Sequence, residues 1–282
     1  MSYTLLARVS GSLDVCIRVS RGTEGGTKDL TDDGRKVARR SDARNSTEER
    51  AAAPKAALRQ SGDRAASPRR AGPTHLASSL IQLAVETPHG RATAHVAKVR
   101  AARGGVVLGH GAGGGIAARD LVAASEAASS AGFSVALVEQ PYRVAGRRSP
   151  APAHQLDAAW VAVVQHLALE ELRGIPLVTG GRSSGARVAC RTASAVGAIG
   201  VLCLAFPLVP PARAGKEPAA SRLPELDAIT VPTLVVQGTN DRFGMPPPSA
   251  QRKVVQVRGD HSLRSDLGTL ATAVGEWLTA LL

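Results

Sequence analysis

From about residue 80 onward, short apolar runs alternate with segments whose apolar residues recur at helical spacing. Short runs rich in Val, Leu and Ile are typical of strands that are buried on both faces. Such strands, separated by helices, predict a mostly parallel sheet that is covered on both sides. The expected strands are residues 105–108, 134–139, 175–179, 199–205, 233–237 and 254–257.

A hairpin is expected at the start of this region. Residues 81–86 and 92–99 are apolar-rich, and Thr87-Pro88-His89-Gly90 between them is a turn sequence. This pair would give the sheet an antiparallel edge. Helices are expected over 117–131, where Gly132 supplies a stop, and over 186–195. Two more helices would each bury one apolar face, formed by Leu156, Trp160, Val163, Val164 and Leu167 in the first and by Leu267, Leu270, Val274, Trp277 and Leu281 in the second.

The N-terminal quarter of the chain has a different character. Between about residues 18 and 73 it contains few large apolar residues and many charges, glycines, serines and prolines. Such a segment buries too little surface to offset its chain entropy. We therefore predict a disordered basic tail over residues 1–78 and an α/β domain over 79–282. The tail could be a basic arm for nucleic acid or a membrane surface, but its charges alternate in sign. That alternation favours a tail without a role, or residues upstream of the natural start.

Composition narrows the class of protein. Hydrophobic residues make up 44% of the chain but aromatic residues only 2%, so the core must be aliphatic. The net charge of +12 suggests either a nucleic-acid partner or simply an arginine-rich composition. Scattered arginines and few aromatic stacking platforms favour the second interpretation. The three cysteines, at positions 16, 190 and 203, form no metal or disulfide pattern. With no apolar run long enough to cross a membrane and no signal peptide, we expect a cytoplasmic protein without a metal or cofactor.

The chemistry-bearing stretch is residues 175–187. Its apolar run ends in Gly180-Gly181-Arg182-Ser183-Ser184-Gly185 and passes into a helical pattern. A strand that stops at G-x-S-x-G and turns sharply into a helix is a nucleophile elbow. The residues two before and two after the serine must be small, because strand and helix approach closely there. Ser183 is therefore the candidate nucleophile. The alternative is an ordinary turn serine before a helix, which would give the same sequence pattern.

A serine nucleophile needs a base and an acid that orients the base. His261 follows the last expected strand and is the candidate base, and Asp241 follows the strand 233–237 and is the candidate acid. Asp260 is a rival for the acid, but it adjoins His261 in sequence and is badly placed to face its ring. The order Ser183, Asp241, His261 is the chain order of α/β hydrolases, with each residue after a separate strand.

The glycine-rich segment Gly109-His110-Gly111-Ala112-Gly113-Gly114 follows the strand 105–108. Backbone amides in such a loop can form an oxyanion hole, and we expect the donors to be the amides of Ala112 and Ser184. The segment also resembles the G-x-G-x-x-G loop of dinucleotide-binding proteins. That interpretation needs an acidic residue about 20 positions later, and Glu139 lies further on.

These pieces together resemble a known family. The chain is similar to bacterial α/β-hydrolase-like proteins related to the eukaryotic testis-expressed and NSL-complex subunit 3 proteins, which are close to dienelactone hydrolases. The resemblance covers about residues 80–282 and implies Ser183, Asp241 and His261 as the triad. Ser184-Gly185-Ala186 departs from the family pattern, where a bulky residue and two glycines are usual, and this concerns the shape of the pocket. The matching segments are residues 108–115, 140–160, 180–189, 206–211, 235–244 and 259–263.

The sequence thus predicts a serine hydrolase that acts on a small ester, thioester or related acyl bond. Some eukaryotic relatives are subunits of chromatin-modifying complexes, so a non-catalytic interaction module is the alternative. Segment 206–222 is too short for a helical cap, which predicts an open site. Gly111, Arg182 and Arg143 are the candidate substrate-binding residues, and the arginines would favour an anionic acyl substrate. Solvated surface arginines are the other interpretation.

Overall fold

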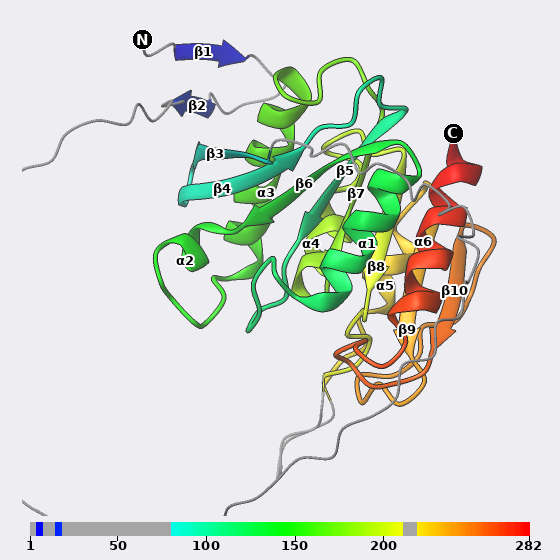
Figure 1. Ribbon diagram of the computed structural model, residues 1–282. Coiled ribbons are helices and arrows are strands. Elements are labelled where there is room, and N and C mark those ends of the chain that lie inside the picture. The colour runs from blue at the N-terminus through cyan, green and yellow to red at the C-terminus, as the bar shows by residue number, and fades with distance from the viewer. Residues whose placement is uncertain (1–3, 8–14, 19–79, 211–218) are drawn as a thin grey trace, which may run out of the picture. The chain divides into compact units, whose positions relative to one another are not determined.

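The computed structural model describes residues 4–7, 15–18, 80–210 and 219–282 (Figure 1). Strands β1 (Thr4–Ala7) and β2 (Val15–Arg18) pair with each other in antiparallel fashion. They lie within the segment 1–78, for which the sequence predicts disorder without any strand. The rest of that segment lies outside the described residues, so the disordered tail and its boundary at residue 78 stay predictions.

Eight strands form a single mixed sheet in the order β10-β9-β8-β7-β5-β6-β4-β3. The strands from β10 to β6 in this order run parallel, and β4 and β3 add an antiparallel edge. The predicted α/β class with its leading hairpin is confirmed. The strands are β3 (Leu80–Thr87), β4 (Gly90–Ala97), β5 (Gly104–Gly109), β6 (Phe133–Glu139), β7 (Leu177–Arg182), β8 (Gly200–Leu204), β9 (Thr233–Gly238) and β10 (Arg252–Val257).

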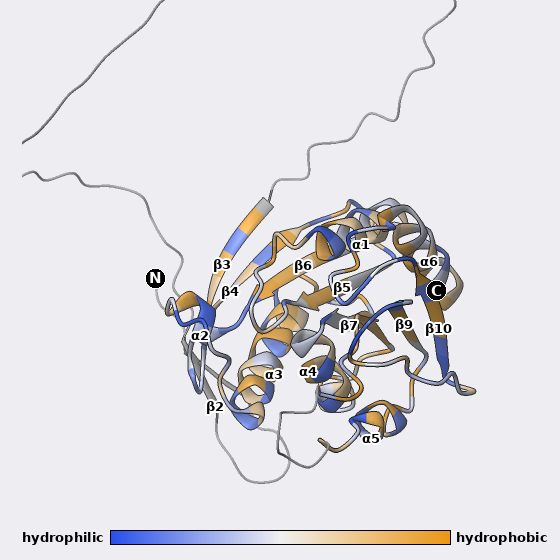
Figure 2. Cartoon of the chain, turned by 90° about the horizontal axis from the view of Figure 1, so that it is seen from below, coloured by the Kyte–Doolittle hydropathy of each residue, from blue (hydrophilic) through white to orange (hydrophobic). Residues whose placement is uncertain are grey.

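Helices cover both faces of this sheet. Figure 2 shows α1 (Arg119–Ser130) and α6 (Leu267–Leu281) on one side of the strands, and α3 (Ala153–Leu169) and α4 (Ser184–Thr192) on the other. Two short helices, α2 (Pro141–Val144) and α5 (Leu223–Asp227), were not expected from the sequence. Both have proline in their first turn, where its fixed φ and missing N–H suit a helix start, so the Pro-rich segments are partly helical.

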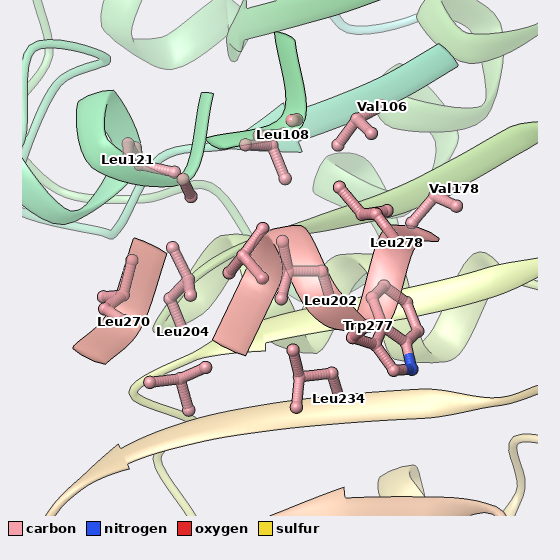
Figure 3. Close-up of a cluster of buried hydrophobic side chains, with 14 of the residues drawn as sticks. Val106, Leu108, Leu121, Val178, Leu202, Leu204, Leu234, Leu270, Trp277 and Leu278 are labelled. Carbon is pink, nitrogen blue, oxygen red and sulfur yellow. The ribbon is translucent and has the colours of Figure 1, made fainter. Parts of the chain in front are cut away.

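The core beneath α1 and α6 is almost entirely aliphatic. Figure 3 shows side chains from β5, β7, β8 and β9 facing those of the two helices, and every one of them is buried. A fully buried side chain of this size contributes about 1.5–3 kcal/mol, so such a cluster fixes the helices on the sheet with few aromatic residues, Phe133 and Trp277 among them. The labelled side chains are Val106, Leu108, Leu121, Val178, Leu202, Leu204, Leu234, Leu270, Trp277 and Leu278.

The parallel strands bring their carboxyl ends to one edge of the sheet. The segments that follow β5, β7, β9 and β10 begin there, and these segments carry every candidate for the triad and the oxyanion hole. Between β8 and β9 the described residues contain only the five-residue helix α5. No helix in the described ranges is both long and apolar enough to cross a membrane.

Candidate active site

Ser183 stands in a strained turn between β7 and α4. Its φ of 52° and ψ of −107° lie outside the conformations that side-chain-bearing residues normally adopt. The Ser183 N–H donates to the Leu204 carbonyl at 2.9 Å, which ties the turn to β8. A Cβ atom on Gly181 or Gly185 would collide with the Gly109 carbonyl oxygen. These two glycines therefore let the elbow pack directly against the end of β5.

Three side chains from separate segments form one chain of hydrogen-bond contacts. The Ser183 Oγ lies 2.9 Å from the Nε2 of His261, and the His261 Nδ1 lies 2.8 Å from the Oδ2 of Asp241. A carboxylate can only accept, so the Nδ1 must carry the ring proton and donate it to Asp241. The Nε2 is then an acceptor, and the Ser183 hydroxyl donates to it. This is the arrangement in which an imidazole can remove a proton from a serine.

The Asp241 carboxylate is completely buried and held from two further sides. The Gln237 Nε2 donates to its Oδ2 at 2.9 Å, and the Phe243 N–H donates to its Oδ1 at 2.9 Å. Gln237 is itself fully buried at the end of β9. Gln237 was not among the candidates from the sequence, although an amide that follows the apolar run 234–236 was a usable signal.

The rival acid, Asp260, makes its side-chain hydrogen bonds to Ser262, while the His261 Nδ1 contacts Asp241. The Asp260 Oδ1 accepts from the Ser262 N–H at 2.9 Å, and hydrogen bonding to Ser262 holds the pKa of Asp260 below its ordinary value. Of the two carboxylates that the sequence left open, the structure brings Asp241 to the histidine.

The imidazole of His261 is also held by packing, because the Phe243 ring lies against it with the ring centres 4.3 Å apart.

The loop after β5 is fixed by its own histidine. The Gln140 N–H donates to the Nε2 of His110 at 3.1 Å, so the proton of this ring lies on Nδ1, which donates to the Gly111 carbonyl at 2.8 Å. Burial lowers the pKa of His110, which favours this neutral form. The Gly111 carbonyl belongs to the same planar peptide unit as the Ala112 N–H, and the two point in opposite directions. His110 therefore sets the direction of the Ala112 N–H.

The two predicted oxyanion donors have no acceptor within the part of the chain that the structure describes. Neither the Ala112 N–H nor the Ser184 N–H donates to an acceptor among the described residues. Gly111 lies beside the nucleophile, since a Cβ on it would come within 3.6 Å of the Ser183 Cβ. Tyr142 of α2 holds the next carbonyl of the loop, because its hydroxyl donates to the Ala112 carbonyl at 3.0 Å.

The structure separates the two arginines that the sequence grouped as substrate-binding. The Arg182 Nε lies 2.9 Å from the Oδ2 of Asp120, and its Nη2 donates to the His261 carbonyl at 3.0 Å. The Asp120 carboxylate thus balances the Arg182 charge. The expected role of Arg182 in binding a substrate carboxylate stays a prediction, which this pairing does not favour. Asp120 was not among the candidates from the sequence, because nothing near it in the chain marks it as a partner of Arg182. Arg143 of α2 is half-buried and makes no ion pair within the described ranges.

Two pockets in the described part of the structure differ in size and in distance from the triad candidates. One, of about 510 Å³, lies between α1 and α6, and none of Ser183, Asp241 and His261 lines it. The other is nearly closed, measures about 10 Å³ and lies beside the elbow between His110, Tyr142, Trp160 and Ser184. Among the residues that the structure describes, no three His, Cys, Asp or Glu side chains are grouped so that they could hold a metal ion.

Solved structures with a similar fold include several hydrolases. A lidless α/β serine hydrolase from Xanthomonas campestris has a TM-score of 0.54 and 19% identity, covering 70% of this chain and 94% of its own. Est1E from Butyrivibrio proteoclasticus has a TM-score of 0.57 and 16% identity, covering 71% and 98%. A dienelactone hydrolase from Anabaena variabilis has a TM-score of 0.58 and 15% identity, covering 72% and 98%. At these identities the likeness shows a shared fold.

The family of the chain is identified from its sequence. A comparison with curated protein sequences finds no match. The relationship to the testis-expressed and NSL-complex subunit 3 proteins stays a prediction. A model of the alpha/beta hydrolase domain, however, matches residues 102–269, which is more than half of the chain and includes all three triad candidates. The chain belongs to the alpha/beta hydrolase domain family.

Proposed function

We propose that this protein is a serine hydrolase that cleaves a small ester, thioester or related acyl bond through an acyl-enzyme. The observation that carries the proposal is the unbroken hydrogen-bond chain from Ser183 through His261 to Asp241. The Ser183 Oγ attacks the acyl carbonyl carbon while its proton moves to the Nε2 of His261. The buried Asp241 carboxylate holds the ring and stabilises the imidazolium that forms.

The negative charge that develops on the substrate oxygen is met by the unused amides of Ala112 and Ser184. Losing one such donor typically costs about 10²–10³ in rate, because the donors are fixed before the reaction begins. The imidazolium then gives its proton to the leaving alcohol or thiol, and the acyl group stays on Ser183. A water molecule, deprotonated by His261, attacks this ester. The bond to the Ser183 Oγ then breaks, His261 returns the proton to the Oγ, and the carboxylic acid is released.

A fluorophosphonate probe tests the nucleophile directly. We expect it to label the folded wild-type chain and to leave the Ser183→Ala variant unlabelled. Ser184→Ala is the matched control, since it removes a neighbouring hydroxyl but keeps the backbone N–H, and its labelling should persist. A folded wild-type chain that resists the probe would contradict the proposal. That outcome would favour a non-catalytic interaction module that retains the hydrolase fold.

Arg143 supports a narrower proposal, that the substrate carries a carboxylate near its acyl group. Its charge acts on both His110 and Tyr142. These two side chains hold the loop after β5 that carries the Ala112 N–H, here called the oxyanion loop. A half-buried guanidinium at this place, without an ion-pair partner in the described part of the chain, can bind an anion through two parallel N–H groups.

The ratio of hydrolysis rates for carboxylate-bearing and neutral esters measures this preference. We expect Arg143→Gln to lower that ratio about 10-fold, which corresponds to the loss of one charge-assisted hydrogen bond. Arg147→Gln is the control, because Arg147 follows in the same segment but is exposed. An unchanged ratio in Arg143→Gln would remove the carboxylate from the proposal and leave the triad untouched.

A further inference from the structure

Arg182 directly precedes the nucleophile, yet its guanidinium is turned into the protein. It reaches two segments that are distant in the chain. The Nε contacts Asp120 in the first turn of α1 at 2.9 Å, and the Nη2 donates to the backbone carbonyl of His261 at 3.0 Å. The carbonyl belongs to the same residue whose ring contacts the Ser183 Oγ. One side chain thus connects the nucleophile's strand to the backbone of the base.

Asp120 gives this connection a fixed anchor. Its carboxylate is 1% exposed and lies at the N-terminus of α1, where the helix dipole favours a negative charge. Burial raises the pKa of Asp120, while the Arg182 charge and the Asp120 and Leu121 amides act in the opposite direction. A buried carboxylate of this kind needs a cation beside it, and Arg182 is the cation that the structure supplies.

The oxyanion loop rests on the same guanidinium. A Cβ on Gly111 would come within 2.8 Å of the Arg182 Nη1, so the glycine backbone lies directly against the planar group. The nucleophile, the base and the oxyanion loop therefore all touch or adjoin Arg182. No other described side chain makes a hydrogen bond to the His261 carbonyl.

We propose that Arg182 is a positioning residue: anchored by Asp120, it fixes the His261 loop and the Gly111 loop relative to Ser183. This inference rests on the proposed hydrolase function and extends it to a residue that does not touch substrate. The geometry needs one planar group that places its charge beside Asp120 and a donor at the His261 carbonyl at the same time, which arginine can do. Lysine keeps the charge but has a single rotating ammonium, so it cannot hold Asp120 and the His261 carbonyl in the same way.

Kinetics of three variants test the proposal. A displacement of about 1 Å in a catalytic group can lower a rate about 100-fold. We therefore expect Arg182→Lys and Asp120→Asn to lower kcat about 10- to 100-fold while KM changes less than about 2-fold. The control is Arg187→Lys, which also disrupts a half-buried arginine–carboxylate pair, here with Glu225. Its kcat should stay within about 2-fold of wild type.

Rates are expressed per folded molecule, with the folded fraction taken from thermal unfolding of each variant. If Arg182 had only a structural role, Arg182→Lys would lower the unfolding temperature and leave kcat per folded molecule unchanged. That result would overturn the proposal. Equal losses of kcat in Arg182→Lys and Arg187→Lys would overturn it as well.

A second measurement does not depend on turnover. The His261 Nδ1 proton, held by Asp241, should give a far-downfield proton NMR signal in the wild type. We expect this signal to weaken or shift in Arg182→Lys and Asp120→Asn and to persist in Arg187→Lys. An unchanged signal in the folded Arg182→Lys protein would refute the positioning role. If the wild type shows the signal but hydrolyses nothing and resists the fluorophosphonate probe, the proposed function fails while the positioning role is still decided.

Discussion

At the scale of single residues, Ser183 carries the clearest sign of a conformation kept for chemistry. Positive φ in a residue with a side chain costs roughly 1–3 kcal/mol, and the surrounding structure must supply that energy. The N–H bond to Leu204 and the close packing of Gly181 and Gly185 on Gly109 hold the serine in place. The strain aims the hydroxyl at His261 instead of at the helix it caps, since Ser183 makes no side-chain capping bond.

This strain predicts that Ser183→Gly is more stable than Ser183→Ala by about 1 kcal/mol. Both variants lose the hydroxyl, but only glycine adopts positive φ without a steric penalty. Urea unfolding of the two variants measures the difference. At the exposed Ser194, whose φ is not positive, the order should reverse, because glycine there only adds freedom to the unfolded chain. A Ser183→Gly variant less stable than Ser183→Ala would show that the turn is not strained.

His110 predicts a pH dependence of stability. Burial lowers its pKa in the folded state below the ordinary 6.5, so below that pH the unfolded chain binds a proton that the folded chain does not. The free energy of unfolding should therefore fall as the pH drops below about 6.5, by up to about 1.4 kcal/mol per pH unit. His110→Asn keeps a donor for the Gly111 carbonyl but does not titrate. Its unfolding free energy should change less between pH 8 and 5.5, and equal changes in both proteins would contradict this assignment.

At the scale of elements, the contact between the elbow and β5 depends on missing side chains. Gly185, in the first turn of α4, faces the Gly109 and His110 carbonyls, and an added Cβ would overlap them. We expect Gly185→Ala to destabilise the protein by about 3 kcal/mol, since neither backbone can yield without disturbing the sheet. Gly275, within α6, has open space where a Cβ would lie, with no neighbouring atom within 4 Å. Gly275→Ala should instead stabilise by up to about 1 kcal/mol, as measured by the same denaturant titration.

Helices and strands that bury one or both faces were predictable, because the buried face requires apolar residues at a regular spacing in the sequence. The strands and the helices α1, α3, α4 and α6 follow their apolar patterns to within a few residues. The short helices α2 and α5 were missed, since four or five residues in a Pro-rich segment carry no period. The same contrast holds at the site. Ser183, Asp241 and His261 could be named as candidates from the sequence because each follows a separate strand.

The supporting side chains were not found, because their roles depend on distances across the fold. Arg182 was assigned to a substrate because it adjoins the nucleophile, and only the packing of α1 on the sheet reveals its pairing with Asp120. Gln237 is fixed by three acceptors, Asp241 Oδ2 and the Phe206 and Gly244 carbonyls, which lie on both sides of it in the chain. Pairing of this kind leaves no periodic or local signal.

At the scale of the whole molecule, the order of strands explains why the site forms at all. The strands β9, β8, β7 and β5 are successive neighbours, so the segments that leave β9, β7 and β5 emerge along a continuous stretch of one edge. His261 joins them from beyond β10, across 78 residues of sequence from Ser183. No pair of these segments would meet without the parallel sheet, so formation of the site is coupled to folding of the entire domain.

That coupling leads to a prediction about the smallest active chain. In the described part, the buried apolar clusters draw on residues from 81 to 281. We expect a variant that begins at residue 79 to unfold cooperatively within a few degrees of the full chain and to label with a fluorophosphonate at a similar rate. A variant that begins at residue 90 also loses β3, whose Val85 is fully buried and whose backbone pairs with β4 along its whole length. It should be strongly destabilised or insoluble, because β4 would become an exposed edge. If the variant that begins at residue 79 fails in the same way, residues 1–78 belong to the folded unit and the predicted boundary is wrong.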